Sequence, residues 1–148
     1  MPIHCTDLRA HSEELAKSGA SEVEIRTSIS RAYYACFHSL MPFVLRLPAS
    51  AQNSQGNRLS HHEMTARISE WKIAEVCPEL ADKKVIKAQI QKALDTARMS
   101  RVVADYRLAD DVTLSEAKMQ IERVRLIMRM VAQIDEMLSD RSEGPVTA

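Results

Sequence analysis

Apolar residues recur at intervals of three and four along most of this chain, which is the spacing expected of helices with one buried face. No stretch alternates polar and apolar residues for long enough to predict a strand, and only three glycines interrupt the pattern. The pattern therefore predicts an all-α fold, an up-and-down bundle of about five helices. The expected helices cover about residues 7–17, 21–45, 60–72, 83–106 and 113–138.

Capping residues support these helix starts. A serine or threonine followed three residues later by glutamate forms a capping box, and the chain contains three such pairs: Ser21 with Glu24, Ser60 with Glu63, and Thr113 with Glu116. Thr6 and Asp82 are expected to cap the other two helices. Pro42 lies inside the second helix, where it is expected to cause a kink or an early end.

The second helix is apolar over most of its circumference, which is typical of a central or interface helix. Its polar positions are Arg31, Tyr34 and His38, which we call the polar strip. At ~100° per residue, Arg31 and His38 lie about 20° apart around the helix and two turns apart along it, so they share a face. The strip is either a binding site or an ordinary surface on which Arg31 pairs with a carboxylate. The expected core residues are Ile25, Ile29, Ala32, Tyr33, Cys36, Phe37, Leu40 and Phe43.

Two adjacent histidines, His61 and His62, stand at the start of the third predicted helix. The helix dipole disfavours positive charge there, so a neutral imidazole able to meet a ligand is expected. Metal binding is the weaker interpretation, because neighbouring side chains on a helix point about 100° apart and no third ligand is evident. Residues 47–60, before this helix, lack periodicity and are expected to form a mobile loop.

A charged residue interrupts the core stripe of the fourth predicted helix. A guanidinium removed from water costs several kcal/mol unless it is paired, so Arg101 needs a partner. Asp105, four residues later, is the nearest, and Tyr106 follows it. This cluster is either a buried ion pair between helices or part of the site begun by the polar strip. The apolar positions of the stripe are Ile86, Ile90, Ala93, Leu94, Ala97, Ala104 and Leu108.

The last predicted helix has a near-heptad apolar stripe and a basic strip on its outer side, formed by Lys118, Arg125 and Arg129. Such a strip is more often a solvated face than a nucleic-acid platform. The chain from Arg141 onward is expected to be a disordered tail, so residues 1–140 are expected to form one domain. The stripe comprises Leu114, Ala117, Ile121, Val124, Met128, Val131 and Leu138.

Charge and cysteine content narrow the function further. The 20 basic and 20 acidic residues cancel, so contact with nucleic acid must come from a local patch rather than from a global field. Three widely spaced cysteines without a C-x-x-C motif fit free thiols in a reducing cytoplasm. No signal peptide or membrane-spanning segment is expected, and neither a metal nor a cofactor is predicted.

Three blocks in this order and spacing resemble the small stand-alone HEPN proteins of bacteria and archaea. They are Ser30-Arg31-Ala32-Tyr33-Tyr34-Ala35 with His38, then Ser60-His61, then Arg101 with Ala104-Asp105-Tyr106, and the resemblance covers about residues 5–138. It implies a HEPN-like helical bundle that usually dimerises. It also implies a metal-independent RNase with an R-x4-6-H motif, often the toxin beside a nucleotidyltransferase-type antitoxin.

The chain departs from the usual position of that motif, since no histidine follows Arg101 at the required spacing. The match falls instead on Arg31 and His38, with six residues between them. In this interpretation His38 is the general acid or base and Arg31 holds the phosphate, while Tyr34, His61, Arg101, Asp105 and Tyr106 bind substrate. The alternative is a noncatalytic HEPN module that binds a nucleotide, RNA or a partner protein.

Two helical turns place Arg31 and His38 about 10 Å apart along the axis, which is long for contacts to one phosphate. A cleft shared by two subunits would relieve this separation. We therefore expect a homodimer in which the second helix lines the interface and the two polar strips meet in a groove.

Overall fold

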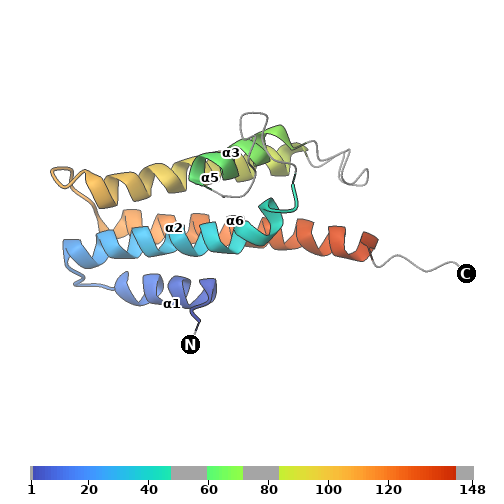
Figure 1. Cartoon of the computed structure of the whole chain (residues 1–148). Helices are drawn as coiled ribbons and strands as arrows, with labels where there is room; N and C mark the ends of the chain where they lie inside the picture. The colour runs from blue at the N-terminus through green and yellow to red at the C-terminus, as the bar shows by residue number, and fades with distance from the viewer. Residues whose placement is uncertain (1, 48–59, 72–83, 143–148) are drawn as a thin grey trace, which may run out of the picture.

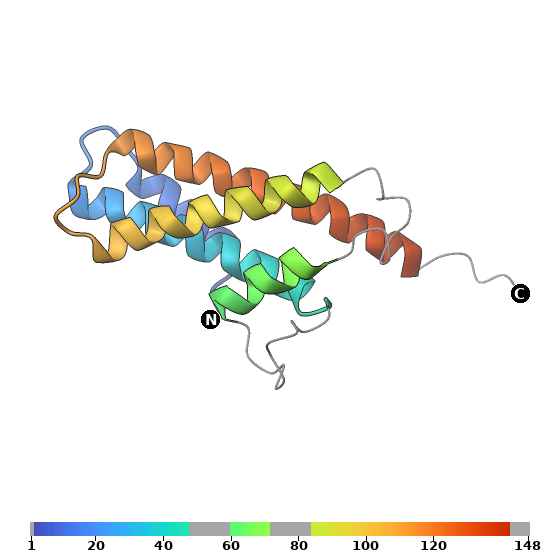
Figure 2. The same ribbon diagram turned by 90° about the horizontal axis from the view of Figure 1, so that it is seen from above.

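The computed structural model describes residues 2–47, 60–71 and 84–142, which form helices and no strand. Three long helices, α2, α5 and α6, and the shorter α1 lie side by side with alternating direction, and the short α3 packs along part of α2 and α5 (Figure 1; Figure 2). The predicted all-α bundle is confirmed for this part of the chain. The helices are α1 (Cys5–Leu15), α2 (Glu22–Val44), α3 (His61–Glu70), α5 (Lys84–Tyr106) and α6 (Leu114–Ser142).

Helix α2 is the centre of the bundle and packs against each of the other four helices. All of its predicted core residues are buried, and Tyr33 is only 1% exposed. Burial of each large apolar side chain contributes roughly 1.5–3 kcal/mol, so α2 supplies much of the stability of the fold. In the middle of α2, Arg31 and His38 of the polar strip are exposed and Tyr34 is half-buried.

The stripes predicted for the two C-terminal helices are only partly right. In α5, Ile90, Leu94, Ala97 and Ala104 are buried, but Leu108 is 74% exposed. The helix ends at Tyr106, so helical periodicity no longer applies at Leu108. In α6 the predicted stripe is too narrow, because the helix packs against α1, α2 and α5. The buried residues that the stripe missed are Gln120, Ile127, Met130 and Ile134, while the side chain of Leu138 lies outside the described part.

Two of the three predicted capping boxes are complete. Ser21 Oγ accepts from the backbone N–H of Glu24 at 3.2 Å, and Glu24 accepts in return from the N–H of Ser21 at 3.1 Å. Thr113 and Glu116 make the same reciprocal pair at 3.3 and 2.7 Å. At α3, Ser60 caps Glu63 at 3.0 Å. The carboxylate of Glu63, however, binds Arg67 Nε at 2.7 Å, within α3 itself.

Two predicted helix limits are wrong, the start of the first helix and the end of the last. The first helix begins at Cys5, and His4 rather than Thr6 is its N-cap; the N–H of His4 donates to Asp7 Oδ2 at 2.9 Å. The predicted end of the second helix near Leu45 is confirmed to within one residue, and Pro42 lies two residues before the end of α2. Helix α6 continues to Ser142, into the segment predicted as a tail from Arg141. Asp82, the interior of the predicted 47–60 loop and residues 143–148 lie outside the described residues.

Helix α1 is fixed to the bundle by polar contacts as well as apolar packing. Ser12 Oγ donates to the carbonyl of Ser28 and Ser28 Oγ donates to the carbonyl of Ser12, both at 2.7 Å in a buried setting. Arg125 Nη2 of α6 binds Glu13 Oε1 at 2.6 Å. These contacts fix the C-terminal half of α1 to α2 and α6.

None of the helices in the described segments is both long enough and apolar enough to cross a membrane. Of the three cysteines, Cys36 is buried and Cys5 is partly exposed, and both are free thiols. Burial raises the pKa of Cys36 to about 12, so this thiol stays protonated. Cys77 lies outside the described residues.

Candidate functional site

A groove of about 560 Å³ lies between the N-terminal segment and α2. The polar strip, Arg31, Tyr34 and His38, lines one side of it. Arg31 and His38 are two helical turns apart, but both side chains border the same groove. Residues of the N-terminal segment and the first turn of α1 line the other side: Ile3, His4, Cys5 and Leu8.

Tyr34 connects this groove to the charged cluster on α5. Arg101 Nη2 donates a hydrogen bond to the hydroxyl oxygen of Tyr34 at 2.9 Å. The guanidinium carbon also lies 5.4 Å from the centre of the Tyr34 ring, 5.8 Å from that of Tyr33 and 5.5 Å from that of Tyr106, distances at which a cation is attracted to an aromatic face. The sequence prediction that Arg101 is buried and paired is confirmed, since its side chain is only 11% exposed.

Asp105 supplies the negative charge beside Arg101. Its Oδ2 lies 3.2 Å from Arg101 Nε in an ion pair, although the N–H of Nε does not point along the line required for a hydrogen bond. The same Oδ2 accepts from Ser30 Oγ of α2 at 3.2 Å. Ser30 and Asp105 thus tie α2 to α5 next to the site and hold the guanidinium in place.

His61, the first residue of α3, faces the same aromatic cluster from the other side. Its Nδ1 lies 2.7 Å from the hydroxyl oxygen of Tyr33, and its ring centre is 4.6 Å from that of Phe37. Burial raises the pKa of Tyr33 to about 12. The pKa of His61 is lowered, first by burial and then by the positive charges of Arg101, Arg98 and His38. The expected neutral form of His61 is supported, with burial as the main cause rather than the helix dipole.

A shift in the pKa of His61 makes stability depend on pH. The unfolded chain takes up this proton near pH 6.5 and the folded protein only at lower pH, so stability is expected to fall as pH drops below about 6.5. His61→Asn should flatten this decline between pH 7.5 and 5.5, measured as the urea midpoint. His11→Asn is the matched control, because His11 is exposed on α1. An equal decline in wild type and in His61→Asn would contradict the assignment.

The structure places the predicted site residues in two connected groups. Three of them line the groove directly. The others join it through Tyr34: His61 by a ring contact at 6.1 Å, Arg101 by its hydrogen bond, and Asp105 and Tyr106 through Arg101. Tyr106 is 69% exposed, so it covers only the outer side of the guanidinium.

Sequence reasoning missed several members of the site. Arg98 acts on both His61 and Tyr33, and its position three residues before Arg101 and seven before Asp105 puts it on the same side of α5. This spacing could have been used to predict that Arg98 lies near the other site residues of α5. The contribution of Ile3, His4, Cys5 and Leu8 to the groove was not readable, because it depends on how α1 packs against α2.

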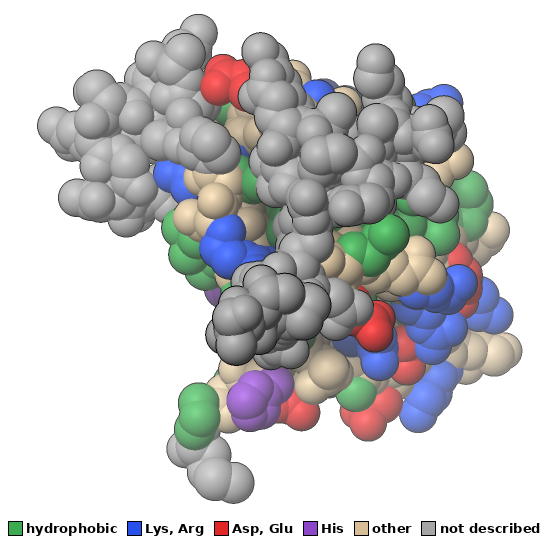
Figure 3. Space-filling view, turned by 90° about the vertical axis from the view of Figure 1, so that its right-hand side faces the viewer, with side chains coloured by type: hydrophobic (Ala, Val, Ile, Leu, Met, Phe, Trp, Pro, Cys, Tyr) green, Lys and Arg blue, Asp and Glu red, His purple; other side chains and the backbone are tan. Residues whose placement is uncertain are grey.

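The basic strip predicted on α6 does not form an unopposed positive surface. Arg125 pairs with Glu13 at 2.6 Å and with Glu122 at 2.8 Å, which favours the solvated-face interpretation. An end-on view of the molecule shows Lys and Arg side chains interspersed with Asp and Glu on its right-hand side (Figure 3). In the described part of the chain, no three His, Cys, Asp or Glu side chains gather in a way that could hold a metal ion.

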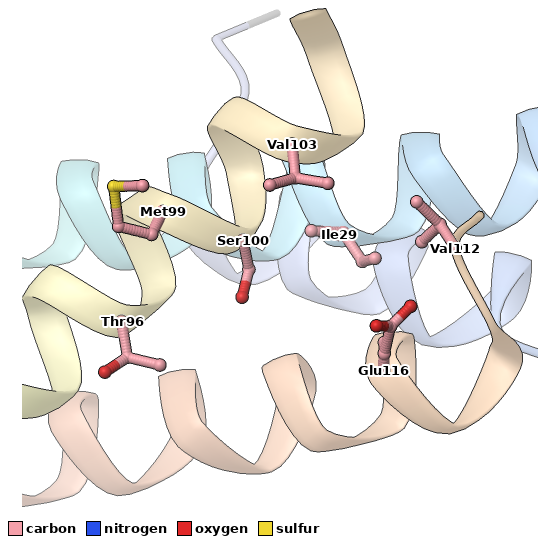
Figure 4. A pocket seen from close by; sticks show the side chains of 7 residues that line it. All are labelled: Ile29, Thr96, Met99, Ser100, Val103, Val112 and Glu116. Carbon is pink, nitrogen blue, oxygen red and sulfur yellow. The ribbon is translucent and has the colours of Figure 1, made fainter. Parts of the chain in front are cut away.

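A second hollow, of about 220 Å³, lies between α5 and the start of α6 and contains none of the predicted site residues. The Glu116 carboxylate and the Ser100 hydroxyl point into the space between the two helices (Figure 4). Glu116 already caps α6 through Thr113. The remaining lining residues are mostly apolar: Ile29, Thr96, Met99, Val103 and Val112.

The fold and the site together define an all-α bundle whose central helix borders a cationic groove next to a tyrosine-caged arginine. Comparison with protein-family models, with curated proteins and with solved structures finds no match to this chain. The geometry of this groove and the resemblance of three sequence blocks to HEPN proteins are therefore the basis on which a function is proposed.

Proposed function

We propose that this protein is a metal-independent RNA endonuclease of the HEPN type that acts in the cytoplasm. Arg31 holds the phosphate, and His38 is the general acid/base. The observation that carries the proposal is the groove of about 560 Å³ that Arg31, Tyr34 and His38 border together. A guanidinium, a hydroxyl and an imidazole around one hollow are suited to a phosphodiester.

The chemistry needs few protein groups, because RNA carries its own nucleophile. The 2′-hydroxyl attacks the adjacent phosphorus, the bond to the 5′-oxygen breaks, and the products are a 2′,3′-cyclic phosphate and a free 5′-hydroxyl. One group must take the proton of the 2′-hydroxyl, one must protonate the leaving oxygen, and a cation must stabilise the negative charge that develops on the non-bridging phosphate oxygens. His38 can do the first two in turn, and Arg31 supplies the third.

The local charge supports an anionic substrate although the chain is neutral overall. Arg31 and His38 border the groove, and Arg98 and Arg101 lie near His61, whose ring contacts that of Tyr34. Asp105 balances Arg101 through their ion pair. Such a patch raises the local concentration of polyanions without requiring a basic protein.

A noncatalytic role remains as a second candidate, because Arg101 already has a carboxylate, a hydroxyl and three aromatic rings as partners. In that case the groove binds a nucleotide, RNA or a partner protein. For either role, the resemblance leads us to propose a homodimer in which the polar strips meet, and a nucleotidyltransferase-type antitoxin as a partner.

Incubation of purified protein with a labelled RNA in excess EDTA tests the proposal. We expect cleavage, with 2′,3′-cyclic phosphate and 5′-hydroxyl ends, because side chains alone perform the proton transfers. Tight RNA binding without cleavage, at any divalent-metal concentration, would favour the noncatalytic candidate. Cleavage that EDTA abolishes would contradict the proposed mechanism.

A further inference from the structure

The direction of the hydrogen bond between Arg101 and Tyr34 determines where the proton of the Tyr34 hydroxyl is free to go. A guanidinium has only donors, so the oxygen of Tyr34 must accept from Arg101 Nη2 at 2.9 Å. The hydroxyl proton of Tyr34 is therefore not used in this contact. Tyr34 also borders the groove with Arg31 and His38.

The position of Arg101 is fixed by several independent contacts. Its Nε pairs with Asp105 at 3.2 Å, Asp105 accepts from Ser30, and three tyrosine rings surround the guanidinium. A cation that donates to a hydroxyl oxygen also draws electron density from it and makes the hydroxyl a stronger donor. Arg101 thus both orients and strengthens the Tyr34 donor.

We infer that the Tyr34 hydroxyl donates a hydrogen bond to a non-bridging oxygen of the phosphate in the groove, and that Arg101 is a positioning residue that acts through Tyr34. This inference rests on the proposed function. It deepens that function by assigning the Tyr34 hydroxyl as the hydrogen-bond donor to the negative charge that develops on the phosphate oxygens. It replaces the expectation that Arg101 binds substrate directly. Arg31 then holds one side of the phosphate and Tyr34 another.

The other two tyrosines do not fit this role. The hydroxyl of Tyr33 is bonded to His61, and its side chain is 1% exposed. Tyr106 stacks on the same guanidinium but is 69% exposed, at the outer edge of the cluster. Among the tyrosines, only Tyr34 combines a bond from Arg101 with a place on the groove.

A double-mutant cycle in RNA cleavage tests the inference. Tyr34→Phe removes one oxygen and keeps the ring against the guanidinium, so we expect the fold to persist and kcat/KM to fall by roughly 10²-fold, mostly in kcat. Arg101→Gln should cause a similar loss. The kcat/KM of the double variant should be no lower than that of the less active single variant, because both changes disable the same hydroxyl. Arg107→Gln, on an exposed arginine just after α5, is the control and should keep wild-type activity.

Binding of a 2′-deoxy oligonucleotide, which lacks the nucleophile, separates the failure of this inference from that of the proposed function. If wild-type protein does not cleave RNA but binds the oligonucleotide, and Tyr34→Phe weakens that binding roughly fivefold, catalysis fails while the donor role stands. Unchanged cleavage and binding in Tyr34→Phe would overturn the inference alone. Additive losses in the cycle would overturn the positioning role of Arg101, and wild-type protein that binds no oligonucleotide would overturn both proposals.

Discussion

Replacement of His38 by alanine is expected to lower the rate of RNA cleavage by about 10³-fold, the usual contribution of a positioned acid or base. Arg31→Ala should cause a loss of similar order, because the cation that holds the phosphate is removed. Both side chains are exposed at the groove. Their removal should therefore leave the unfolding midpoint of the bundle within the small range of ordinary surface substitutions.

The matched control for His38→Ala is His11→Ala, since His11 is an exposed histidine on α1 that does not line the groove. It should retain wild-type cleavage. Circular dichroism of all three variants establishes that the fold is kept. Full activity in both Arg31→Ala and His38→Ala would rule out the polar strip as the catalytic site.

Replacement of Arg26 by alanine is expected to destabilise the protein by about 3 kcal/mol, the largest stability effect that we predict for one side chain. Arg26 is buried, and its Nη1 donates to the carbonyls of Val103, Ala104 and Arg107 at 3.0–3.2 Å. Its Nη2 donates to the carbonyl of Asp110. The guanidinium thus binds four carbonyls at the end of α5 and in the turn after it, of which those of Val103 and Arg107 also accept from backbone N–H groups.

Urea unfolding measures this effect, with two further variants for comparison. Arg9→Ala removes an exposed arginine that pairs with Glu13 at 3.8 Å, and it should change stability by no more than about 0.5 kcal/mol. Arg26→Lys keeps the charge but cannot reach several carbonyls at once, so most of the loss should remain. If Arg26→Ala is as stable as Arg9→Ala, the contacts of Arg26 with the carbonyls make no net contribution to the stability of the protein.

The sequence predicted the central helix well because its signals are local. The spacing of Ile25, Ile29 and Leu40 defines the buried face without reference to the rest of the chain. The capping pairs Ser21–Glu24 and Thr113–Glu116 involve residues three apart, and they form as predicted. Arg31 and His38 could be assigned to one face for the same reason.

Features that depend on distant segments could not be predicted in this way. Arg26 is an unexceptional arginine in the sequence, and its carbonyl partners lie 77–84 residues later. The hydrogen bond of Arg101 to Tyr34 spans 67 residues, so the sequence indicated that Arg101 needs partners but not that one of them is Tyr34.

A crystal structure of the protein with a 2′-deoxy dinucleotide shows whether the groove bordered by Arg31, Tyr34 and His38 holds a phosphodiester. We expect the bridging phosphate in the groove, with its oxygens within hydrogen-bond distance of all three side chains. A phosphate bound instead on the α6 strip of Lys118, Arg125 and Arg129, with the groove empty at saturating dinucleotide, would contradict it.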